Sequence, residues 1–278
     1  MIGDLHCHTR FSDGSLGIDD LILYAKRAGL DFVALTDHDT MAGVSRAEQL
    51  GKRYGIGVIG GVEISARDFA RDRKVHLLCY QPKVPDRLEG MLKHTLEGRD
   101  RAIRESMRRV MKLFPVTEEH VLRCAKGSAA LYNVHIMLAL ADLGYAESLY
   151  GSLFRQLLAE KTGSCFVPHA YPDVWEAAKL VKSAGGVCVL AHPSEYDSID
   201  LMEELAGAGV IDGVERYHPR VREKDIPAID AVIERYGLIA TGGTDFHGGN
   251  TNHPNPLGTC LTMQEPLERL FKLSKSRS

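Results

Sequence analysis

Apolar and polar positions follow two different periodic patterns along the first 80 residues of the chain. Short apolar runs such as Phe32-Val33-Ala34-Leu35 have the composition of buried strands. Between these runs, apolar residues recur every three or four positions, which predicts amphipathic helices. Strands that alternate with helices usually pair in parallel, so the pattern predicts an α/β architecture. We expect strands at 2–8, 32–35, 56–64 and 75–80, and helices at 18–29 and 44–54.

The alternation of predicted strands and helices stops after Pro82. From Pro85 to about Lys161 the spacing of apolar residues predicts helices without strands, which indicates a helical insertion or cap. Alternation of strands and helices resumes at Val174 and continues to the end of the chain. Helices are expected at 88–113, 117–124, 134–143, 149–160, 174–184, 199–208, 225–236 and 266–273, and strands at 187–191, 212–217, 238–243 and 257–263.

Composition narrows the class of protein. With 278 residues and 44% hydrophobic content, the chain can bury a large core, and its net charge of −3 gives no bulk electrostatic case for a nucleic-acid or membrane-surface partner. The six cysteines include no C-x-x-C pair, so we expect reduced and mostly buried thiols. Neither a signal peptide nor a long apolar span is visible, which makes the cytoplasm the expected location.

Nine residues of metal-binding type stand in short clusters where apolar runs stop. His6 and His8 are two apart on an expected strand, so both point to the same face, and Asp245 and His247 repeat this spacing. Burying so many ionisable groups without a metal would cost several kcal/mol for each unpaired charge. Strand ends that converge on one face of a barrel are where a polynuclear site can form. The predicted ligands are His6, His8, Asp13, His38, Glu63, His76, His192, Asp245 and His247.

These clusters resemble the motifs of the PHP family, the polymerase and histidinol phosphatase domains. The resemblance rests on His6-Cys7-His8-Thr9-Arg10-Phe11-Ser12-Asp13-Gly14, Leu35-Thr36-Asp37-His38-Asp39-Thr40, Gly61-Val62-Glu63-Ile64-Ser65, Ala191-His192-Pro193 and Gly243-Thr244-Asp245-Phe246-His247. It implies a distorted (β/α)7 barrel, formed by residues 1–82 and 167–278, with a helical cap at 83–166.

The resemblance also implies a site for two or three divalent metal ions. His6, His8, Glu63 and Asp245 would hold the first ion, Glu63 with His76 and His192 the second, and Asp13, His38 and His247 the third. Such ligands suit manganese, iron and zinc alike. Closely spaced ions lower the pKa of a bridging water toward about 7 and polarise phosphoryl oxygens, so no serine or cysteine nucleophile is needed. Asp245, His247, Glu63 and His38 are the residues expected to serve catalysis.

The expected activity is the metal-dependent hydrolysis of a small phosphate ester. The substrate would be a nucleotide or sugar phosphate, cleaved as a monoester or as a cyclic diester. Candidate substrate contacts are His135, His169, Arg216, His218 and Lys161. His135 matches a family position in an Arg-x-His pattern, in which Asn133 replaces the arginine. Asp37 and Asp39 are expected to support neighbouring groups or cap a helix, and the basic stretch 99–109 to form a solvated helix face.

Three alternatives remain open from the sequence. The chain could be a nuclease that trims short oligonucleotides, a histidinol-phosphate phosphatase, or a metal-binding module without activity. The negative net charge and scarce aromatic residues argue against long nucleic acid as a partner, and the complete ligand set argues against a module without activity. No membrane partner is expected, and the oligomeric state is left open.

Overall fold

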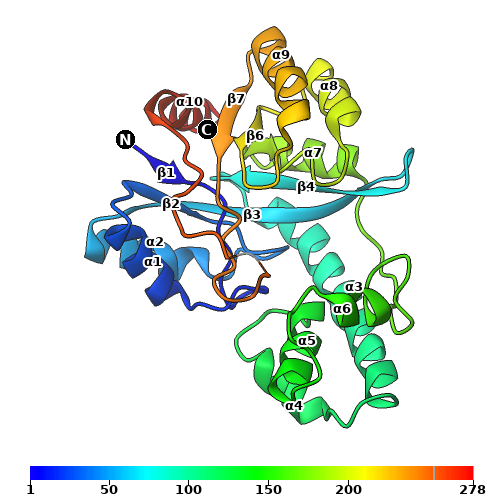
Figure 1. Cartoon of the computed structure of the whole chain (residues 1–278). Coiled ribbons are helices and arrows are strands. Elements are labelled where there is room, and N and C mark those ends of the chain that lie inside the picture. The colour runs from blue at the N-terminus through cyan, green and yellow to red at the C-terminus, as the bar shows by residue number, and fades with distance from the viewer. Residues whose placement is uncertain (253, 278) are drawn as a thin grey trace.

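A sheet of seven strands forms the centre of the protein, as a computed structural model describes it for residues 1–252 and 254–277. The strands lie side by side in sequence order, and the two edges approach one another. Just beyond the first strand, the amide of Leu5 donates to Gly242 O at 3.1 Å, and Cys7 forms a parallel bridge with Phe246. The sheet is therefore nearly closed into a barrel (Figure 1). The strands are β1 (Gly3–Asp4), β2 (Phe32–Leu35), β3 (Gly57–Asp68), β4 (Arg73–Tyr80), β5 (Val187–Leu190), β6 (Gly213–Tyr217) and β7 (Ile239–Gly242).

The expectation of purely parallel pairing is wrong for one strand. β4 runs antiparallel to both β3 and β5, while the other neighbours pair in parallel. The reason lies in the connection, because only residues 69–72 separate β3 from β4 and a chain that short cannot cross over to make a parallel pair. A parallel connection needs a dozen or more residues, which the other links provide with their helices.

Helices cover the outside of the barrel. Those that follow β1 and β2 lie together on one side, and those that lead into or out of β5 and β6 lie on the other (Figure 1). Among the described helices, none combines the length and the apolar character that crossing a bilayer requires. The barrel helices are α1 (Ile18–Arg27), α2 (Val44–Tyr54), α7 (Val174–Ser183), α8 (Ile199–Gly207), α9 (Ile226–Tyr236) and α10 (Gln264–Ser276), with a 3-10 turn at Glu223–Asp225.

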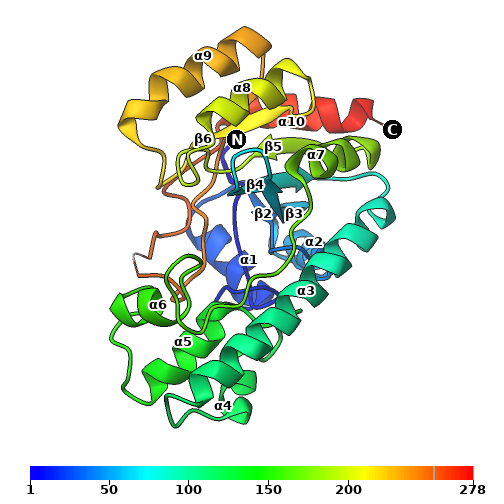
Figure 2. The same ribbon diagram turned by 90° about the vertical axis from the view of Figure 1, so that its right-hand side faces the viewer.

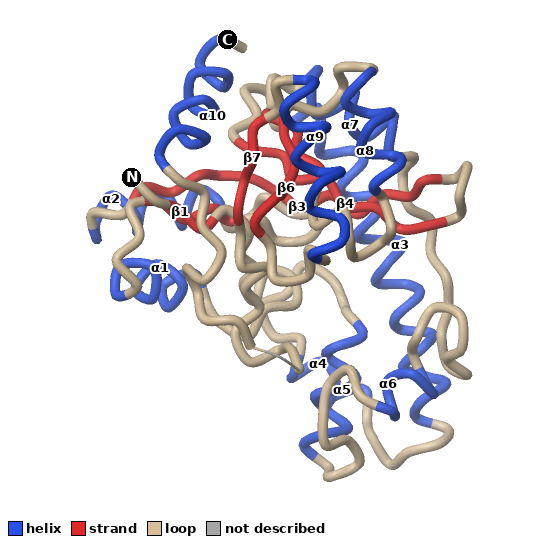
Figure 3. Tube along the Cα trace, turned by 45° about the horizontal axis from the view of Figure 1, so that its top comes forward, coloured by secondary structure: helices blue, strands red, loops and turns tan. Residues whose placement is uncertain are grey.

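Four further helices form the insertion: α3 (Asp86–Met111), α4 (Glu118–Cys124), α5 (Asn133–Asp142) and α6 (Ser152–Leu157). The long α3 leaves the barrel beside α7 and runs down to the other three (Figure 2), which lie apart from the strands (Figure 3). These helices share a separate apolar cluster that includes Met107, Val121 and Ile136. Thr117 caps α4 by accepting the amide of His120 at 3.2 Å, as its position in the sequence predicts.

Two predicted strands differ from the structure. The expected strand at 257–263 is absent from the described residues, and that segment makes only an isolated bridge between Thr262 and Gly3. The expected strand at 2–8 shortens to Gly3–Asp4. Beyond Asp4 the backbone lies between the segments that follow β2 and β7, where Cys7 O accepts the amide of Thr36 at 3.0 Å and the amide of His8 donates to Phe246 O at 2.8 Å. This departure from regular pairing brings the two histidines that follow β1 to the centre of the barrel end.

Leu78 lies fully buried on β4 within the apolar cluster that fills the barrel. Replacing it with alanine removes three buried carbons and leaves a cavity, so we expect the free energy of unfolding to fall by about 2–5 kcal/mol. Urea denaturation followed by circular dichroism measures this change. Leu113→Ala is the matched control, because Leu113 is 59% exposed and its loss should change stability by less than about 0.5 kcal/mol. Equal effects of the two substitutions would contradict the assigned core.

Candidate metal centre

The nine predicted ligands meet at one end of the barrel although they are up to 241 positions apart in the chain. His6, His8, His38, His192 and Asp245 lie just after strands that pair in parallel, where the carboxyl ends of those strands converge. Glu63 and His76 lie within β3 and β4 and point to the same end. The remaining two, Asp13 and His247, lie on the loops that follow β1 and β7.

Glu63 is the shared centre of this cluster. Its Oε1 lies 2.8 Å from His76 Nδ1 and 2.9 Å from His192 Nε2. Its Oε2 lies 3.1 Å from both His8 Nε2 and His38 Nδ1. His6 Nε2 also lies 3.2 Å from Oε2, so this one carboxylate faces five imidazoles from four separate segments. Its two oxygens contact different histidines.

Two further carboxylates complete the cluster. Asp245 Oδ1 lies 3.3 Å from His8 Nε2 and 3.5 Å from His6 Nε2, and these three residues form a group with Glu63. Asp13 Oδ1 lies 3.3 Å from His247 Nε2. His8, Asp13, His38 and His247 form a second group with their ligand atoms within 4.8 Å of one another.

Several atoms of this cluster are buried and have no hydrogen-bond partner. They belong to residues of at most 12% side-chain exposure. Imidazole nitrogens and carboxylate oxygens left in this state are what a transition-metal or zinc ion binds, so the residues fit divalent cations. Among the nine clustered residues, these atoms are His6 Nε2, His8 Nε2, Asp13 Oδ1, His38 Nδ1, Glu63 Oε2 and His192 Nδ1.

The electrostatics of the cluster favour positive charge. Burial by itself lowers the pKa of His8, but the nearby carboxylates of Asp245, Glu63 and Asp13 outweigh burial and raise the pKa to about 10. Burial raises the pKa of Glu63, yet the surrounding histidines hold it well below its ordinary value. The carboxylates therefore stay ionised and attract either protons or metal cations to the imidazoles.

The backbone is held in unusual conformations at three points of the site. Asp39, His192 and Asp245 adopt φ angles of 55°, 25° and 52°, in the left-handed region that residues other than glycine rarely adopt. Next to Asp245, Gly243 lies so close to His6 that an added Cβ would stand 2.3 Å from His6 Cβ. Two of these three unusual backbone conformations thus fall on predicted ligands, His192 and Asp245.

Two buried carboxylates orient the ligands, and neither was predicted from the sequence. Glu215 on β6 lies with Oε1 2.9 Å from His6 Nδ1, and its Oε2 accepts the amide of His192 at 2.9 Å. Asp4 accepts the amides of Thr244 at 2.9 Å and Gly258 at 2.8 Å. An acidic residue next to Val214 in an apolar strand is the one signal that could have identified Glu215, and nothing in the sequence distinguishes Asp4.

Asp37 and Asp39 support neighbouring loops, as predicted, although neither caps a helix. Asp37 accepts the amide and hydroxyl of Thr9, each at 2.7 Å, and the hydroxyl of Ser12 at 2.6 Å. Asp39 accepts the amide of Ser65 at 2.9 Å. The loop between His8 and Asp13 is thereby fixed to the end of β2.

The cluster forms the floor of a cavity of about 750 Å³ between the barrel and the insertion. Aromatic side chains wall it, including Tyr132, Tyr150, Phe154, Tyr171 and Tyr196. The wall also carries Asn133, Asn250 and Asn252 together with the cations Lys74, Arg99 and Arg220. A cavity of this size with metal-type ligands on its floor and polar groups on its walls suits a small charged molecule.

The five predicted substrate contacts do not all reach this cavity. His169 and His218 line it, and His218 Nε2 lies 3.6 Å from Asp245 Oδ2 at the edge of the metal cluster. Lys161, Arg216 and His135 are absent from its lining. Lys161 is exposed, and Arg216 Nε donates to Asp230 Oδ1 at 2.5 Å on the outer face.

His135 serves a local structural purpose instead. Its Nδ1 accepts the amide of Tyr132 at 3.1 Å and so closes the first turn of α5, and burial lowers its pKa to about 4. The neighbouring Asn133, which stands where the family pattern has arginine, does line the cavity.

The prediction that residues 99–109 form a solvated helix face is wrong for Arg99. Its side chain is only 11% exposed, and its Nη2 donates to Asp39 Oδ2 at 2.5 Å and to Ser65 Oγ at 2.8 Å. Arg101, Arg108 and Arg109 are exposed as expected. The sequence does not distinguish these arginines because only the docking of α3 on the barrel decides which one is covered.

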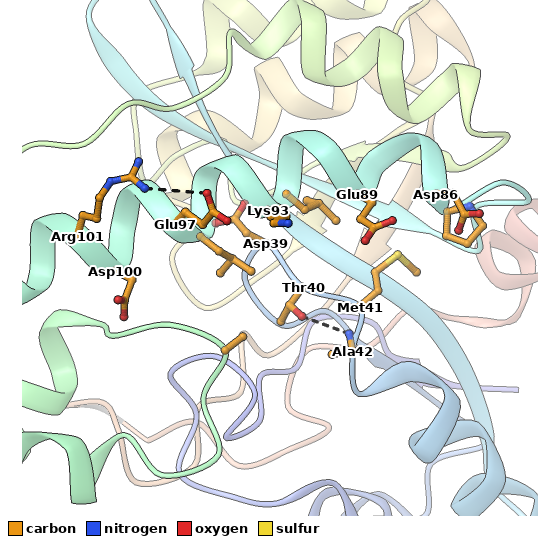
Figure 4. A pocket seen from close by; sticks show the side chains of 14 residues that line it. Asp39, Thr40, Met41, Ala42, Asp86, Glu89, Lys93, Glu97, Asp100 and Arg101 are labelled. Carbon is orange, nitrogen blue, oxygen red and sulfur yellow. Dashed lines mark hydrogen bonds and ion pairs between the residues drawn. The ribbon is translucent and has the colours of Figure 1, made fainter.

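A second cavity of about 710 Å³ lies on the other side of Asp39, between α3 and residues 39–42 (Figure 4). Along the upper side of this cavity, α3 contributes the side chains of Asp86, Glu89, Lys93 and Glu97. Met41 faces them from the loop. Among the described residues that line it, none is a histidine or cysteine. It therefore lacks the ligand types that the first cavity holds, and we place the reaction in the first.

Gly243→Ala should disrupt the metal centre specifically. The new methyl group would overlap His6, which would have to move away from its position in the cluster. We therefore expect divalent-metal affinity to fall by about 10–100-fold. Metal content after dialysis, measured by plasma emission spectrometry, tests this. Gly90→Ala is the control, because a Cβ there meets nothing within 4 Å and alanine in a helix should be neutral or stabilising by about 0.5–1 kcal/mol. Normal metal content in Gly243→Ala would refute the tight fit.

Glu215→Gln should weaken metal binding while preserving the shape of the side chain. The amide cannot supply the negative charge that orients His6, and we expect about a 10–100-fold rise in the dissociation constant for Mn²⁺ or Zn²⁺ in calorimetric titration. Glu234→Gln on exposed α9 is the matched control and should bind as the unmodified protein does. An unchanged dissociation constant in Glu215→Gln would mean that this carboxylate has no part in holding the ligands.

Comparisons with known proteins agree with this geometry. The PHP domain model matches residues 4–184. Over 251 residues the chain is 38% identical to the phosphoribosyl 1,2-cyclic phosphate 1,2-diphosphodiesterase of Eggerthella lenta, which covers 89% of this chain and 95% of that protein. It is 30% identical over 252 residues to the 5'-3' exoribonuclease of Haemophilus influenzae, with 88% and 89% covered.

A solved structure shares the whole architecture. A Bifidobacterium adolescentis protein assigned to the metal-dependent phosphoesterases superposes with a TM-score of 0.88 at 30% identity, covering 98% of this chain and 96% of the other. The predicted barrel of seven strands with helices is thereby confirmed, as is the resemblance noted from the motifs. The chain belongs to the PHP domain family and is a metal-dependent phosphoesterase, a hydrolase.

Proposed function

We propose that this protein hydrolyses a cyclic phosphodiester of a small phosphorylated sugar and then removes the phosphate from the monoester that results. The observation that carries the proposal is the three-carboxylate, multi-histidine cluster on the floor of a confined cavity of about 750 Å³. The identity to the Eggerthella lenta enzyme, 38% over 95% of its length, supports phosphoribosyl 1,2-cyclic phosphate as the substrate.

The nine clustered residues would hold two or three divalent ions of manganese, iron or zinc. His6, His8 and Asp245 would share one ion with Glu63, and His76 and His192 would share another with the opposite oxygen of Glu63. Asp13, His38 and His247 would hold a third, which is supported by their grouping at one edge of the cluster. Ions bound there would supply an acidified water and polarise the phosphoryl oxygens. Asp245, His247, Glu63 and His38 serve catalysis through this ligation.

The protein's own side chains orient the substrate and limit the access of water. Residues 83–166 act as a cap over a barrel formed by 1–82 and 167–278, and Tyr132 of the cap donates from its hydroxyl to His38 O at 3.1 Å. His218 Nε2 has no hydrogen-bond partner and faces the cavity beside Asp245, so it is placed to give a proton to a leaving oxygen. Asn133, Asn250 and Asn252 offer neutral donors to sugar hydroxyls.

A second candidate, cleavage of short oligonucleotides, is favoured by the aromatic walls. Tyr150, Phe154 and Tyr171 line the cavity, aromatic side chains are the groups on which bases stack, and the Haemophilus influenzae relative is an exoribonuclease. Direct comparison of the two substrate classes separates the candidates. A strong fall of kcat/KM for a trinucleotide with rising salt, at rates above those for the cyclic sugar phosphate, would favour the nuclease.

Phosphate release from phosphoribosyl 1,2-cyclic phosphate, with manganese supplied, tests the main proposal. We expect turnover that stops after exhaustive chelation and returns with Mn²⁺. His8→Ala and Asp245→Ala should each lower kcat by about 10³-fold or more, because each removes a ligand from the cluster. His94→Ala, on the exposed face of α3, is the control and should retain full activity. Undiminished rates after chelation would refute the proposed mechanism.

A further inference from the structure

One group of metal-type side chains lies in the insertion, outside the barrel centre: His120, Cys124 and Asp142. We propose that these three residues form a separate zinc site that joins α4 to α5. The proposal is independent of the reaction proposed above, because the three residues lie outside the lining of the substrate cavity.

Helical spacing places two of the three ligands together. His120 and Cys124 are four residues apart on α4, so their side chains lie on the same face, one turn apart. Asp142 is the last residue of α5, which packs against α4 through the apolar cluster that holds Val121 and Leu140. The site is therefore built from two helices whose relative position the core of the insertion fixes, at the end of the insertion away from the sheet (Figures 1 and 2).

The ligand atoms of the three residues lie close enough to share one ion. His120 Nε2 lies 3.0 Å from Asp142 Oδ2, and one ligand atom from each residue lies within 4.8 Å of the others. Ligands of a tetrahedral zinc ion stand roughly 3–4 Å from one another, as bond lengths of about 2.0–2.3 Å require. Small rotations of the side chains therefore bring all three around a single ion, with a fourth position left for water.

The donor atoms of this group select a different class of metal from the barrel centre. A thiolate beside an imidazole favours zinc and related transition-metal ions, whereas calcium and magnesium prefer oxygen ligands. The nine clustered residues of the barrel include no cysteine, so the donors there are nitrogen and oxygen. The sulfur of Cys124 therefore distinguishes the two sites chemically.

The local charges favour a cation at this point. Asp142 ends α5, where the helix dipole is negative, and the last turn of that helix carries no basic residue. Burial and the charge of Asp142 raise the pKa of the Cys124 thiol, against a smaller opposite effect of Arg123. A bound cation offsets the influence of Asp142 and makes the thiolate the stable form of Cys124.

An ion pair alone explains only part of this arrangement. The pair of His120 and Asp142 contributes little stability by itself, because Asp142 is 60% exposed and water screens the interaction. The pair leaves the half-buried Cys124 without a role. Zinc binding uses all three groups, and the exposure of Asp142 gives the ion a path from solution.

Metal bound in the insertion stabilises the helix that begins at the wall of the substrate cavity. α4 has seven residues, which is too short for a stable isolated helix. α5 spans ten residues, or about 15 Å, and its first residue, Asn133, lines the cavity. An ion at Asp142 therefore holds the far end of that helix and fixes α4 to it, while the two metal sites stay well separated.

Cobalt titration distinguishes the two sites. Co²⁺ bound by a thiolate gives a sulfur-to-metal charge-transfer band in the near ultraviolet, which nitrogen and oxygen ligands do not give. We expect the protein, first loaded with Mn²⁺, to develop this band with a stoichiometric amount of Co²⁺ and to lose it when Zn²⁺ is added.

Three variants locate the thiolate. Cys124→Ser should abolish the band, and His120→Ala should weaken Co²⁺ binding by about tenfold or more. Cys260→Ser is the matched control, because Cys260 is the other half-buried cysteine, and it should keep the band.

A labelling experiment on the unmodified protein needs no variant. Zn²⁺ should protect Cys124 of the Mn²⁺-loaded protein from alkylation by iodoacetamide, while Cys260 should react at the same rate with and without Zn²⁺. Mass spectrometry of the peptides measures both rates. In hydrogen exchange, the amides of α4 should exchange more slowly after Zn²⁺ is added to the unmodified protein and to Cys260→Ser, but not to Cys124→Ser.

Four results would overturn the inference. They are the lack of a thiolate band at saturating Co²⁺, a band that persists in Cys124→Ser, a band that needs a large excess of Co²⁺ and so reports adventitious binding, and alkylation of Cys124 that Zn²⁺ leaves unchanged. The last result decides the question even if a variant does not fold. Exchange in α4 that Zn²⁺ does not slow would refute the stabilising role of the site.

Discussion

The site depends on one buried carboxylate that five imidazoles surround. Glu63 is 1% exposed and has histidines from four segments within 3.1 Å of its two oxygens. A cluster of so many ionisable groups, buried away from water, is stable only if positive charge lies between the groups, since each unpaired buried charge lowers the free energy of unfolding. The demand for cations is therefore built into the fold, and the barrel end closes around it.

The surrounding structure serves to hold these groups at fixed positions. Glu215 contacts Nδ1 of His6, whose Nε2 faces Glu63, and Asp37 ties the loop with Asp13 to the end of β2. Gly243 permits the close approach of the last strand to His6. Ligands that are oriented by buried partners lose little entropy when a metal binds, which explains why so many buried polar groups surround the cluster.

The insertion converts a metal-binding barrel end into an enclosed cavity. Tyr132 and Arg99 come from different cap helices and both contact the segment that carries His38 and Asp39. The insertion therefore contacts the loop beside the cluster directly, and its side chains form part of the cavity wall.

The sequence by itself identified the nine residues that meet at the barrel end and most of the elements. Spacing two apart, as in His6 and His8, places side chains on one face wherever the strand lies, and apolar periodicity depends only on local geometry. Tertiary structure alone decided that β4 runs antiparallel, that Glu215 orients His6, and that Arg99 is buried while Arg101 is exposed. It also kept Arg216 and Lys161 outside the cavity. Such outcomes depend on which surfaces come into contact when distant segments pack, and the local order of residues does not record that.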